Sequence, residues 1–415
     1  MITNLKFSLA YFKAFIKWTV LSVIVGILGG ILGSVFHICI DKATSLRTDN
    51  GFLLYFLPLG GILITAMYRL FSSKGRIDTN RVIDSVRKDG KVPLVMIPLI
   101  FISTVITHLL GGSAGREGAA IQLGGSVGYN MGKALRLSEE DMHIIVMSGM
   151  ASVFSALFGT PLTAAVFSIE VITVGVMHYA AIVPCVLASV TAYLISGVLG
   201  LSGVRFSAIA AESISPRNLL AVAILALLCA LVSILFCTSI KKSEKIMDKL
   251  LKNAYLRAFV GGAVIVLLSM ILGTRDYNGA GMDVISRAMG GDASWEAFLL
   301  KIIFTAITIS AGFKGGEIVP AFFIGSTFGC VVGPMLGLGA PFSAAIGFVA
   351  LFCGVVNCPI ASIVLSVEVF GADGIIFFAL ASAISYMMSG CSGLYHSQKI
   401  VYSKFDDKYI DMNTR

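Results

Sequence analysis

Charged residues are scarce in this sequence. Asp, Glu, Lys and Arg make up 13% of its 415 residues, whereas 57% are hydrophobic and the mean hydropathy is +0.91. Soluble domains carry about 25% charged residues, and a chain with so few cannot cover a surface that faces water. The composition therefore excludes an ordinary soluble domain.

Long polar stretches are also lacking. Apolar runs recur along the whole chain, at 15–40, 52–68, 92–111, 144–170, 179–200, 218–238, 258–273, 317–338, 343–370 and 374–390. Each run is long enough for one membrane helix or for a broken pair of helices. The chain also has 44 glycines, and glycine or proline interrupts several runs, which is typical of tilted or broken helices that line a cavity. These patterns predict an all-α integral membrane protein in a lipid bilayer.

Patterns for metals, cofactors and disulfides are missing. The eight cysteines form no CxxC pair and most lie in apolar segments, so we expect free thiols. The five histidines are scattered without the spacing of metal ligands. The sequence therefore predicts neither a metal site nor a cofactor.

The basic residues form four clusters that alternate with the apolar runs. The clusters extend from Lys6 to Lys17, from Arg69 to Lys91, from Lys241 to Arg257 and from Lys399 to Arg415. By the positive-inside rule we expect these regions, and both termini, on the cytoplasmic side. Nucleic-acid binding also produces basic clusters, but their alternation with membrane runs argues against a nucleic-acid partner.

One carboxyl group stands in a glycine-rich segment that otherwise suits a membrane. Glu117 occurs in GGSAGREGAAIQLGG, residues 111–125. A carboxyl group at bilayer depth costs about 2.5 kcal/mol or more, so it marks a functional site by default. The glycines leave backbone N–H groups open at a helix start, where anions bind. A titratable carboxylate beside an anion site predicts that proton and anion movements are coupled.

Several motifs occur twice in the same order. Gly115-Arg116-Glu117 corresponds to Gly315-Gly316-Glu317, and Gly125-Ser126-Val127 to Gly325-Ser326-Thr327. A segment with the spacing Pro-x8-Glu follows in each half and ends at Glu170 or at Glu368. Repetition in the same order predicts two related halves.

The repeat divides the chain into four regions. We expect a first transmembrane repeat at 10–205, a connecting region with a basic cytoplasmic segment at 206–257, the remainder of the second repeat at 258–400 and a short cytoplasmic tail at 401–415. Such halves are often inverted in membrane proteins, with broken helices that meet near the midplane. Inversion would bring Glu117 and Glu317 towards one site.

These motifs resemble those of the CLC family of anion channels and anion/proton antiporters. Gly115-Arg116-Glu117-Gly118 resembles the family's GxEGP motif, with Ala119 where Pro is usual, and Gly315 to Pro320 resembles its second anion-binding motif, usually GxFxP. The resemblance extends over the whole chain, including Tyr395 near the C-terminus. It implies a homodimer with one pathway per subunit, and a minimal prokaryotic form that crosses the inner (plasma) membrane many times.

Two departures resemble the fluoride-exporting CLC-F branch. Chloride-selective members carry a GSGIP-type loop whose Ser contacts the anion, but residues 75–84 here read GRIDTNRVID. Glu317 occupies a position that is usually apolar. The inner proton-transfer Glu of chloride antiporters aligns with Val171, and its absence also fits the fluoride branch. Val319 departs from that branch, which often has Thr there.

The resemblance and the chemistry suggest roles for single residues. Glu117 is the candidate gate: deprotonated it occupies an anion position, and protonated it swings away. Glu317 would offer an O–H donor to fluoride or take protons from the cytoplasm, unless it is a helix-terminus carboxylate held by backbone N–H groups. Tyr395 matches the family's central-site Tyr, whose hydroxyl donates to the anion; the alternative is an interfacial aromatic. Thr79 and Asn80 are candidates to replace the missing Ser, or they cap a helix.

The remaining candidates act through the backbone or as structural groups. Backbone contacts to the anion are expected around Glu317 and in the first motif, at Gly115, Arg116, Gly118, Gly315, Gly316, Ile318 and Val319. Arg116 would anchor its motif and attract anions to the vestibule. Glu170 and Glu368 each end an apolar helix, and we favour a structural role for both.

The function that we favour at this point is fluoride/proton antiport. Fluoride is small and strongly hydrated, so a site must replace its water with strong donors such as a neutral carboxylic acid or a phenol. The rivals are a chloride/proton antiporter or a passive channel for chloride or fluoride. An intramembrane enzyme with Ser113, Ser126 or Ser326 as nucleophile lacks a recurring partner base. A purely structural or receptor role would not need two buried, equivalent glutamates.

Overall fold

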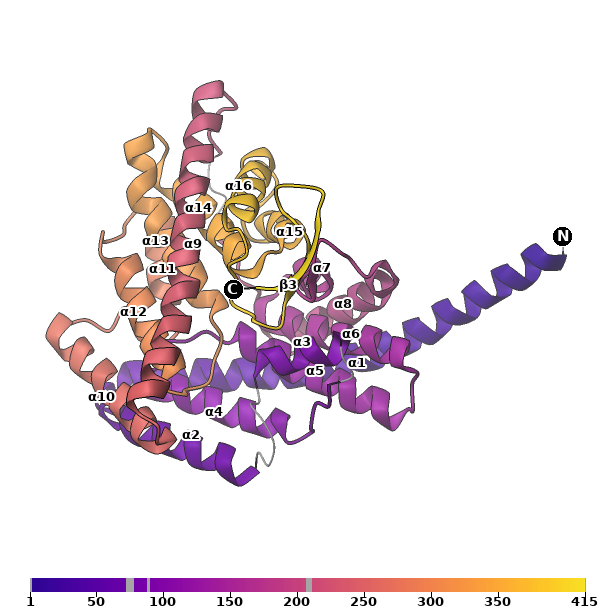
Figure 1. The fold of residues 1–415 in the computed structure, drawn as a ribbon, viewed down its shortest axis with the longest axis horizontal. Coiled ribbons are helices and arrows are strands. Elements are labelled where there is room, and N and C mark those ends of the chain that lie inside the picture. Colours follow the sequence, from indigo (N-terminus) through magenta and orange to yellow (C-terminus); the bar gives the residue numbers. More distant parts are fainter. Residues whose placement is uncertain (1, 72–77, 88–89, 207–210, 415) are drawn as a thin grey trace.

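The computed structural model describes residues 2–71, 78–87, 90–206 and 211–414, with residues 2–10 described as backbone only. These residues form sixteen α-helices and three short strands (Figure 1). Seven helical spans in the described part are long and apolar enough to cross a membrane. The predicted class, an all-α integral membrane protein, is confirmed.

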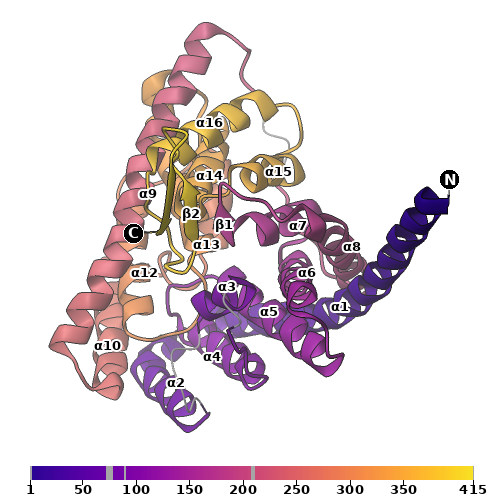
Figure 2. The same ribbon diagram turned by 45° about the vertical axis from the view of Figure 1, so that its right-hand side comes forward.

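The helices of the first half precede those of the second half without interleaving. The first half contains α1 (Ile2–Asp49), α2 (Leu57–Phe71), α3 (Thr79–Arg87), α4 (Met96–Leu110), α5 (Glu117–Ala134), α6 (Glu139–Phe158), α7 (Pro161–Glu170) and α8 (Ile182–Val198). The second half contains α9 (Pro216–Leu250), α10 (Ala254–Leu272), α11 (Met282–Met289), α12 (Ala297–Ser310), α13 (Ile318–Val332), α14 (Ala340–Val356), α15 (Pro359–Phe370) and α16 (Ile375–Met388). Figure 2 shows the two halves side by side.

Proline and left-handed residues set the breaks between the short helices. Gly159 ends α6 in the left-handed conformation and Asn357 ends α14 in the same way, at φ 74° and 58°. Pro161 and Pro359 then stand at the start of α7 and α15, where their missing N–H groups cost no helical hydrogen bond. The same local chemistry therefore produces the same broken helix in both halves.

Small residues let the main helix pair of each half pack backbone to backbone. A Cβ atom on Gly124 of α5 would overlap the carbonyl group of Gly149 on α6, and one on Gly325 of α13 would overlap that of Gly347 on α14. Close approach through glycine is the usual packing device of membrane helices. Because the two pairs correspond in sequence, each half has the same central helix pair.

The two central pairs run in opposite directions from their starting points. The segments before α5 and α13 form an antiparallel bridge, in which Gly115 and Gly316 exchange two N–H···O bonds of 2.7 Å. From there α5 leads to the end of the molecule where Asp141, in the first turn of α6, forms an ion pair with Lys17 of α1. Beyond α13, Gly339 donates to Glu212, which lies just before the start of α9. The arrangement is that of inverted repeats.

Two glutamates join the broken helices α7 and α15 reciprocally. Glu368, near the end of α15, accepts from the N–H groups of Leu162 and Thr163 at 2.9 and 2.8 Å and from the Thr163 hydroxyl at 2.6 Å. Glu170, at the end of α7, accepts from the N–H groups of Ile360 and Ala361 at 3.1 and 2.8 Å. Each carboxylate thus caps the N-terminus of the other helix. These contacts agree with the structural role favoured for both residues.

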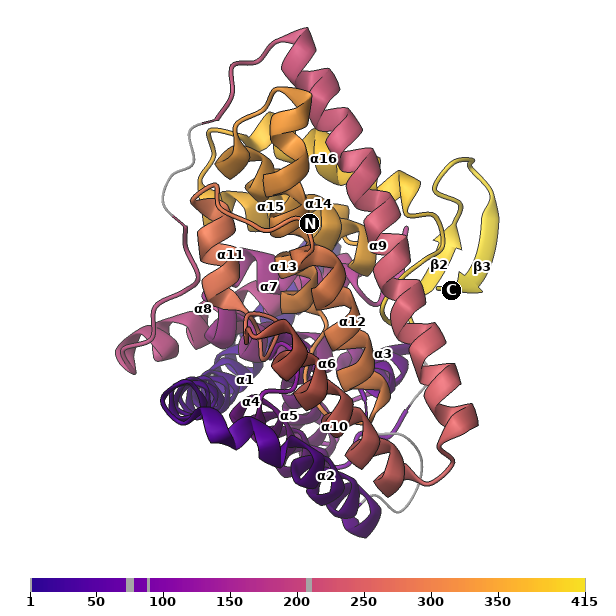
Figure 3. The ribbon, with the colours of Figure 1, turned by 90° about the vertical axis from the view of Figure 1, so that its left-hand side faces the viewer.

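A small sheet was not anticipated by the sequence analysis. Strand β1 (Thr173–Val174), just after α7, pairs in parallel with β2 (Lys399–Tyr402) (Figure 2). Strand β2 also pairs antiparallel with β3 (Tyr409–Asn413) (Figure 3). Residues expected to form only a short tail therefore connect the end of the chain to the first half. Ile400, fully buried, fixes β2 against the helices.

Candidate functional site

The two glycine-rich segments meet at one point because they lack side chains there. A Cβ atom on Gly118 would lie 2.8 Å from the Gly316 Cα atom, and one on Gly115 would lie 2.9 Å from the Val319 Cβ atom. A Cβ atom on Gly315 would collide with the side chain of Ala114. All four motif glycines therefore serve close approach of the backbone.

Helices α5 and α13 both begin at this meeting point. Helix α5 begins at Glu117 and α13 begins at Ile318, each two residues after its bridged glycine. The first N–H groups of a helix have no partner within the helix and carry partial positive charge. Ile318 and Val319 are almost fully buried, at 0% and 1% exposure, so their backbone N–H groups are sheltered from bulk water. This is the geometry of an anion site.

Glu117 is closed off from solvent at the start of α5. Its side chain is 1% exposed, and its Oε2 atom accepts from the Arg116 N–H at 3.0 Å. The Arg116 Nε atom lies 3.7 Å from the Oε1 atom. The carboxylate therefore occupies the place at its own helix N-terminus that an anion would take, as a closed gate would.

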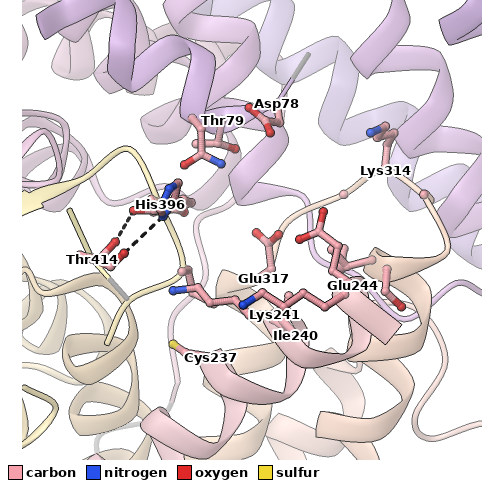
Figure 4. Close-up of a pocket in the computed structure, with 18 of the residues that line it drawn as sticks. Asp78, Thr79, Cys237, Ile240, Lys241, Glu244, Lys314, Glu317, His396 and Thr414 are labelled. Atoms are coloured by element: carbon pink, nitrogen blue, oxygen red, sulfur yellow. Dashed lines mark hydrogen bonds between the residues drawn. The ribbon is translucent and has the colours of Figure 1, made fainter. Parts of the chain in front are cut away.

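Glu317 has a different environment from Glu117. It is the N-cap residue of α13 and lines a cavity of about 970 Å³. In Figure 4 the carboxylates of Glu317 and of Glu244 on α9 point into the same space. A carboxyl group at this position can exchange protons with water in the cavity. The two equivalent glutamates are thus one sealed and one accessible carboxyl group.

Tyr395 supplies an uncommitted hydroxyl group. The residue is 2% exposed, lines the same cavity and lies within electrostatic range of Glu317 and Glu117. Its hydroxyl is buried and has no hydrogen-bond partner among the described residues. A buried donor without a partner is costly and indicates a missing ligand. The position therefore suits a hydroxyl that donates to a bound anion.

Thr79 and Asn80 lie at the site, at the start of α3, and both line the cavity. The Thr79 hydroxyl receives a hydrogen bond from the Gln122 side chain at 3.0 Å and donates to the Gly118 carbonyl at 3.5 Å. The Asn80 side-chain oxygen accepts from the Ser397 N–H at 2.9 Å, and its NH2 group is the remaining donor of that side chain. Asn80 is thus better placed than Thr79 to donate a hydrogen bond to the anion in place of the missing Ser. Residues 75–77 of that loop lie outside the described part of the chain.

The sequence analysis did not single out several polar residues at the site. Gln122, on α5, donates to the Thr79 hydroxyl of α3, and its side-chain oxygen is buried without a partner among the described residues. Lys241, Glu244 and Lys314 line the cavity and are labelled in Figure 4. Gln122 could have been found, because it is a lone amide in the first apolar turns of α5. Lys314 could also have been found, because it lies three residues before Glu317. Lys241 and Glu244 could not, because only the fold brings α9 to Glu317.

The three serines considered as nucleophiles make structural contacts. The Ser113 hydroxyl pairs with the Thr305 hydroxyl at 3.0 Å, the Ser126 hydroxyl donates to the Pro93 carbonyl at 3.4 Å, and the Ser326 hydroxyl donates to the Phe323 carbonyl at 3.1 Å. None of these contacts involves a base, so they lend the enzyme interpretation no support.

Inverted broken helices that bring two N-termini and two carboxyl groups together beside a cavity define a class of multi-pass membrane transport protein. The family described as voltage gated chloride channel matches residues 60–390. A chloride/fluoride channel protein of Pseudomonas syringae pv. tomato is 34% identical over 396 residues, which cover 94% of this chain and 87% of the relative. The chain belongs to the CLC family, as its motifs predicted.

Known structures agree with this assignment. The crystal structure of a CLC-type fluoride/proton antiporter superposes with a TM-score of 0.88 and 30% identity, and the match covers 92% of this chain and 97% of that one. A slow cyanobacterial Cl−/H+ antiporter shares the fold, with a TM-score of 0.76 at 19% identity over 90% of this chain and 94% of that one.

A more distant relative was found by sequence. An H(+)/Cl(−) exchange transporter of Vibrio campbellii is 26% identical over 66% of this chain and 62% of its own length.

Proposed function

We propose that this protein is a fluoride/proton antiporter that exports cytoplasmic fluoride. The observation that carries the proposal is the position of Glu317, a carboxyl group at the N-terminus of the second central helix that faces a wide cavity. The names of two similar proteins support it: a chloride/fluoride channel protein and a CLC-type fluoride/proton antiporter.

The cavity faces the cytoplasm in this proposal. Lys241, Lys245 and Arg257, from one of the predicted cytoplasmic clusters, line it. The ion pair of Lys17 with Asp141 and the stacking of Arg69 on Tyr255 at 4.5 Å bring further basic residues to helix ends near that side. By the positive-inside rule this end, with both termini, lies in the cytoplasm of a bacterial cell with the protein in its inner membrane. The segment before α5 then faces outwards.

Each carboxyl group serves one side of the membrane. Protonated Glu117 would leave the N-terminus of α5 and open the site to the outside. Charged Glu117 would return and exclude the anion. Glu317 would take a proton from the cavity or offer its O–H to fluoride that enters from the cytoplasm. Alternation between these states would move fluoride out of the cell and protons into it.

The donors at the site suit a strongly hydrated anion. The backbone N–H groups at the starts of α5 and α13, the Tyr395 hydroxyl and a protonated Glu317 are all donors that can replace water around fluoride. Protons would enter the cell down their gradient, and this entry would supply the driving force for fluoride export. The resemblance to the family also suggests a homodimer with one pathway per subunit, which we include in the proposal.

A chloride/proton antiporter or a passive channel for chloride or fluoride is the second candidate. Val319 favours it, because an apolar side chain stands where the fluoride branch often has a Thr hydroxyl. The name of the Pseudomonas relative, a channel protein for both anions, also allows it.

Flux measurements on reconstituted protein separate these candidates. Liposomes loaded with equal fluoride and chloride would be diluted into a medium without either anion, and both effluxes recorded with selective electrodes. The proposal predicts fast fluoride efflux and little chloride efflux. Equal rates for both anions would contradict fluoride selectivity and favour the second candidate.

A further inference from the structure

A row of charged groups connects Glu117 with the water-exposed side of α1. The Arg116 guanidinium stands between two carboxylates: its Nη1 atom lies 2.8 Å from Asp41 Oδ1, and its Nε atom lies 3.7 Å from Glu117 Oε1. Exposure of the side chains rises along the row, from 1% at Glu117 through 12% at Arg116 to 55% at Asp41. Arg116 is therefore hydrogen-bonded to the exposed carboxylate and only loosely paired with the buried one.

A histidine holds the other side of Asp41. The Nε2 atom of His37, one turn earlier on α1, lies 3.0 Å from Asp41 Oδ2. Of the other charged or titratable groups of this region, Lys42, the next residue along α1, is exposed, whereas Arg47 and His108 have partners of their own. Arg47 donates to the His108 carbonyl at 2.7 Å, and the His108 Nδ1 atom lies 2.9 Å from the Thr104 carbonyl. Asp41 thus has two partners, one on its own helix and one at the start of α5.

We propose that Asp41 is a positioning residue that sets the acidity at which Glu117 takes up a proton, by holding Arg116 away from it. The inference rests on the proposed role of Glu117 as the proton-accepting gate. The Arg116 guanidinium is within hydrogen-bond distance of Asp41, at 2.8 Å, but stays 3.7 Å from the Glu117 carboxylate, so its position is set by Asp41. While Asp41 is charged, it holds the Arg116 guanidinium by a hydrogen bond. The negative charge of the buried Glu117 carboxylate is then only weakly stabilised by Arg116.

Loss of the charge on Asp41 changes this balance. Arg116 then closes the gap to Glu117, and full contact with a guanidinium stabilises the charged carboxylate. A proton from the outer solution must compete with that contact before the gate can leave the helix N-terminus. Transport therefore requires a more acidic medium when Asp41 is neutral.

The substitution Asp41→Asn tests this sequence of events. Fluoride efflux from liposomes would be measured at a series of pH values, equal on both sides so that protein orientation does not matter. We expect the pH of half-maximal transport to fall by about one unit or more, the size of effect that an added opposite charge has on a carboxyl group. Asp41→Glu, which restores the charge, should return the profile towards that of the unmodified protein.

A matched control separates the effect of losing the contact between Asp41 and Arg116 from the effect of losing one surface charge. Asp49, exposed at the end of the same helix, is replaced by Asn, which removes the same charge without a contact to Arg116. Asp49→Asn should leave the profile in place. An unchanged profile in Asp41→Asn, or an equal shift in both variants, would overturn the proposal.

Arg116 provides a second, independent arm. In Arg116→Gln the shared cation is gone, so adding Asp41→Asn should cause no further shift. A full additional shift in the double variant would show that Asp41 acts without Arg116 and would overturn the proposal. Failure of the proposed function is recognised separately, because the unmodified protein would then transport fluoride without pH dependence.

Discussion

At the scale of residues, the site contains two glutamates with equal sequence context and unequal surroundings. Glu117 is sealed at the start of α5 beside Arg116, whereas Glu317 faces the cavity at the start of α13. The equivalent motifs of the inverted halves thus hold one sealed and one accessible carboxyl group. In the proposed antiport each group would serve one side of the membrane, so proton transfer across the protein would need both.

Replacement of Glu317 should impair transport more than it impairs folding. Glu317→Ala removes the carboxyl group from the cavity, and we expect at least a tenfold slower fluoride efflux, in the range of effects of proton-transfer groups. Glu317→Gln keeps an N–H donor but cannot carry a proton, so it should lose proton movement even if fluoride passes. Efflux and proton uptake in liposomes, with gel filtration as a measure of folding, check both variants.

A charge control accompanies that measurement. Asp407→Asn removes an exposed acid in the segment between β2 and β3 and should transport as the unmodified protein does. Parallel loss of assembly and transport in Glu317→Ala would instead indicate that the residue only caps α13.

At the scale of elements, α7 and α15 form a unit held by exchanged caps. Each helix begins at a proline, is short and ends near a glutamate that caps the other helix. Neither helix has a side-chain cap from its own N-cap residue. The exchange therefore satisfies N-terminal N–H groups that neither helix caps by itself.

Removal of one cap should destabilise the protein. Glu368→Gln loses the charge that faces two N–H groups and one hydroxyl, at an expected cost of about 1–2 kcal/mol in the free energy of unfolding. Thermal unfolding in detergent measures it as a lower midpoint. Asp373→Asn, an exposed acid just after α15, is the control and should leave the midpoint unchanged. Equal midpoints for both variants would contradict a capping role.

The C-terminal segment holds Tyr395, whose hydroxyl is the proposed donor to the anion. The buried Thr414 donates to the Tyr395 carbonyl at 2.6 Å, and both line the cavity. Thr414→Val keeps the shape but loses this bond, so we expect a several-fold slower fluoride efflux because small displacements of a binding group weaken its action. Thr65→Val is the control, since that hydroxyl bonds only within α2. Equal fluoride efflux by the two variants would contradict a role of Thr414 in positioning Tyr395.

Sequence patterns predicted the parts of the fold that local chemistry fixes. Pro161 and Pro359 start half-helices, and glycine motifs bring Glu117 and Glu317 to one point. Contacts between distant segments outside the repeated motifs were out of reach. The sheet at 399–413 rests on pairing with β1, more than 200 residues earlier. No local pattern shows that Asp41 would meet Arg116 or that Ser397 would hold Asn80.

At the scale of the whole molecule, the inverted halves explain how one chain can serve two sides of a membrane. The central helices start at a shared point and leave in opposite directions, so the segment before α5 and the segment before α13 approach that point from opposite sides. In the proposed antiport, coupling would rest on the two glutamates at this point.

The central claim is that fluoride flow and proton flow are obligatorily coupled through Glu117. The most direct measurement loads liposomes with fluoride, imposes a pH gradient that opposes proton uptake, and records proton movement as fluoride leaves. We predict uphill proton uptake by the unmodified protein, abolished by a protonophore, and none by Glu117→Gln, which mimics the protonated gate. Fluoride efflux without proton uptake in the unmodified protein, or normal coupling in Glu117→Gln, would contradict the account.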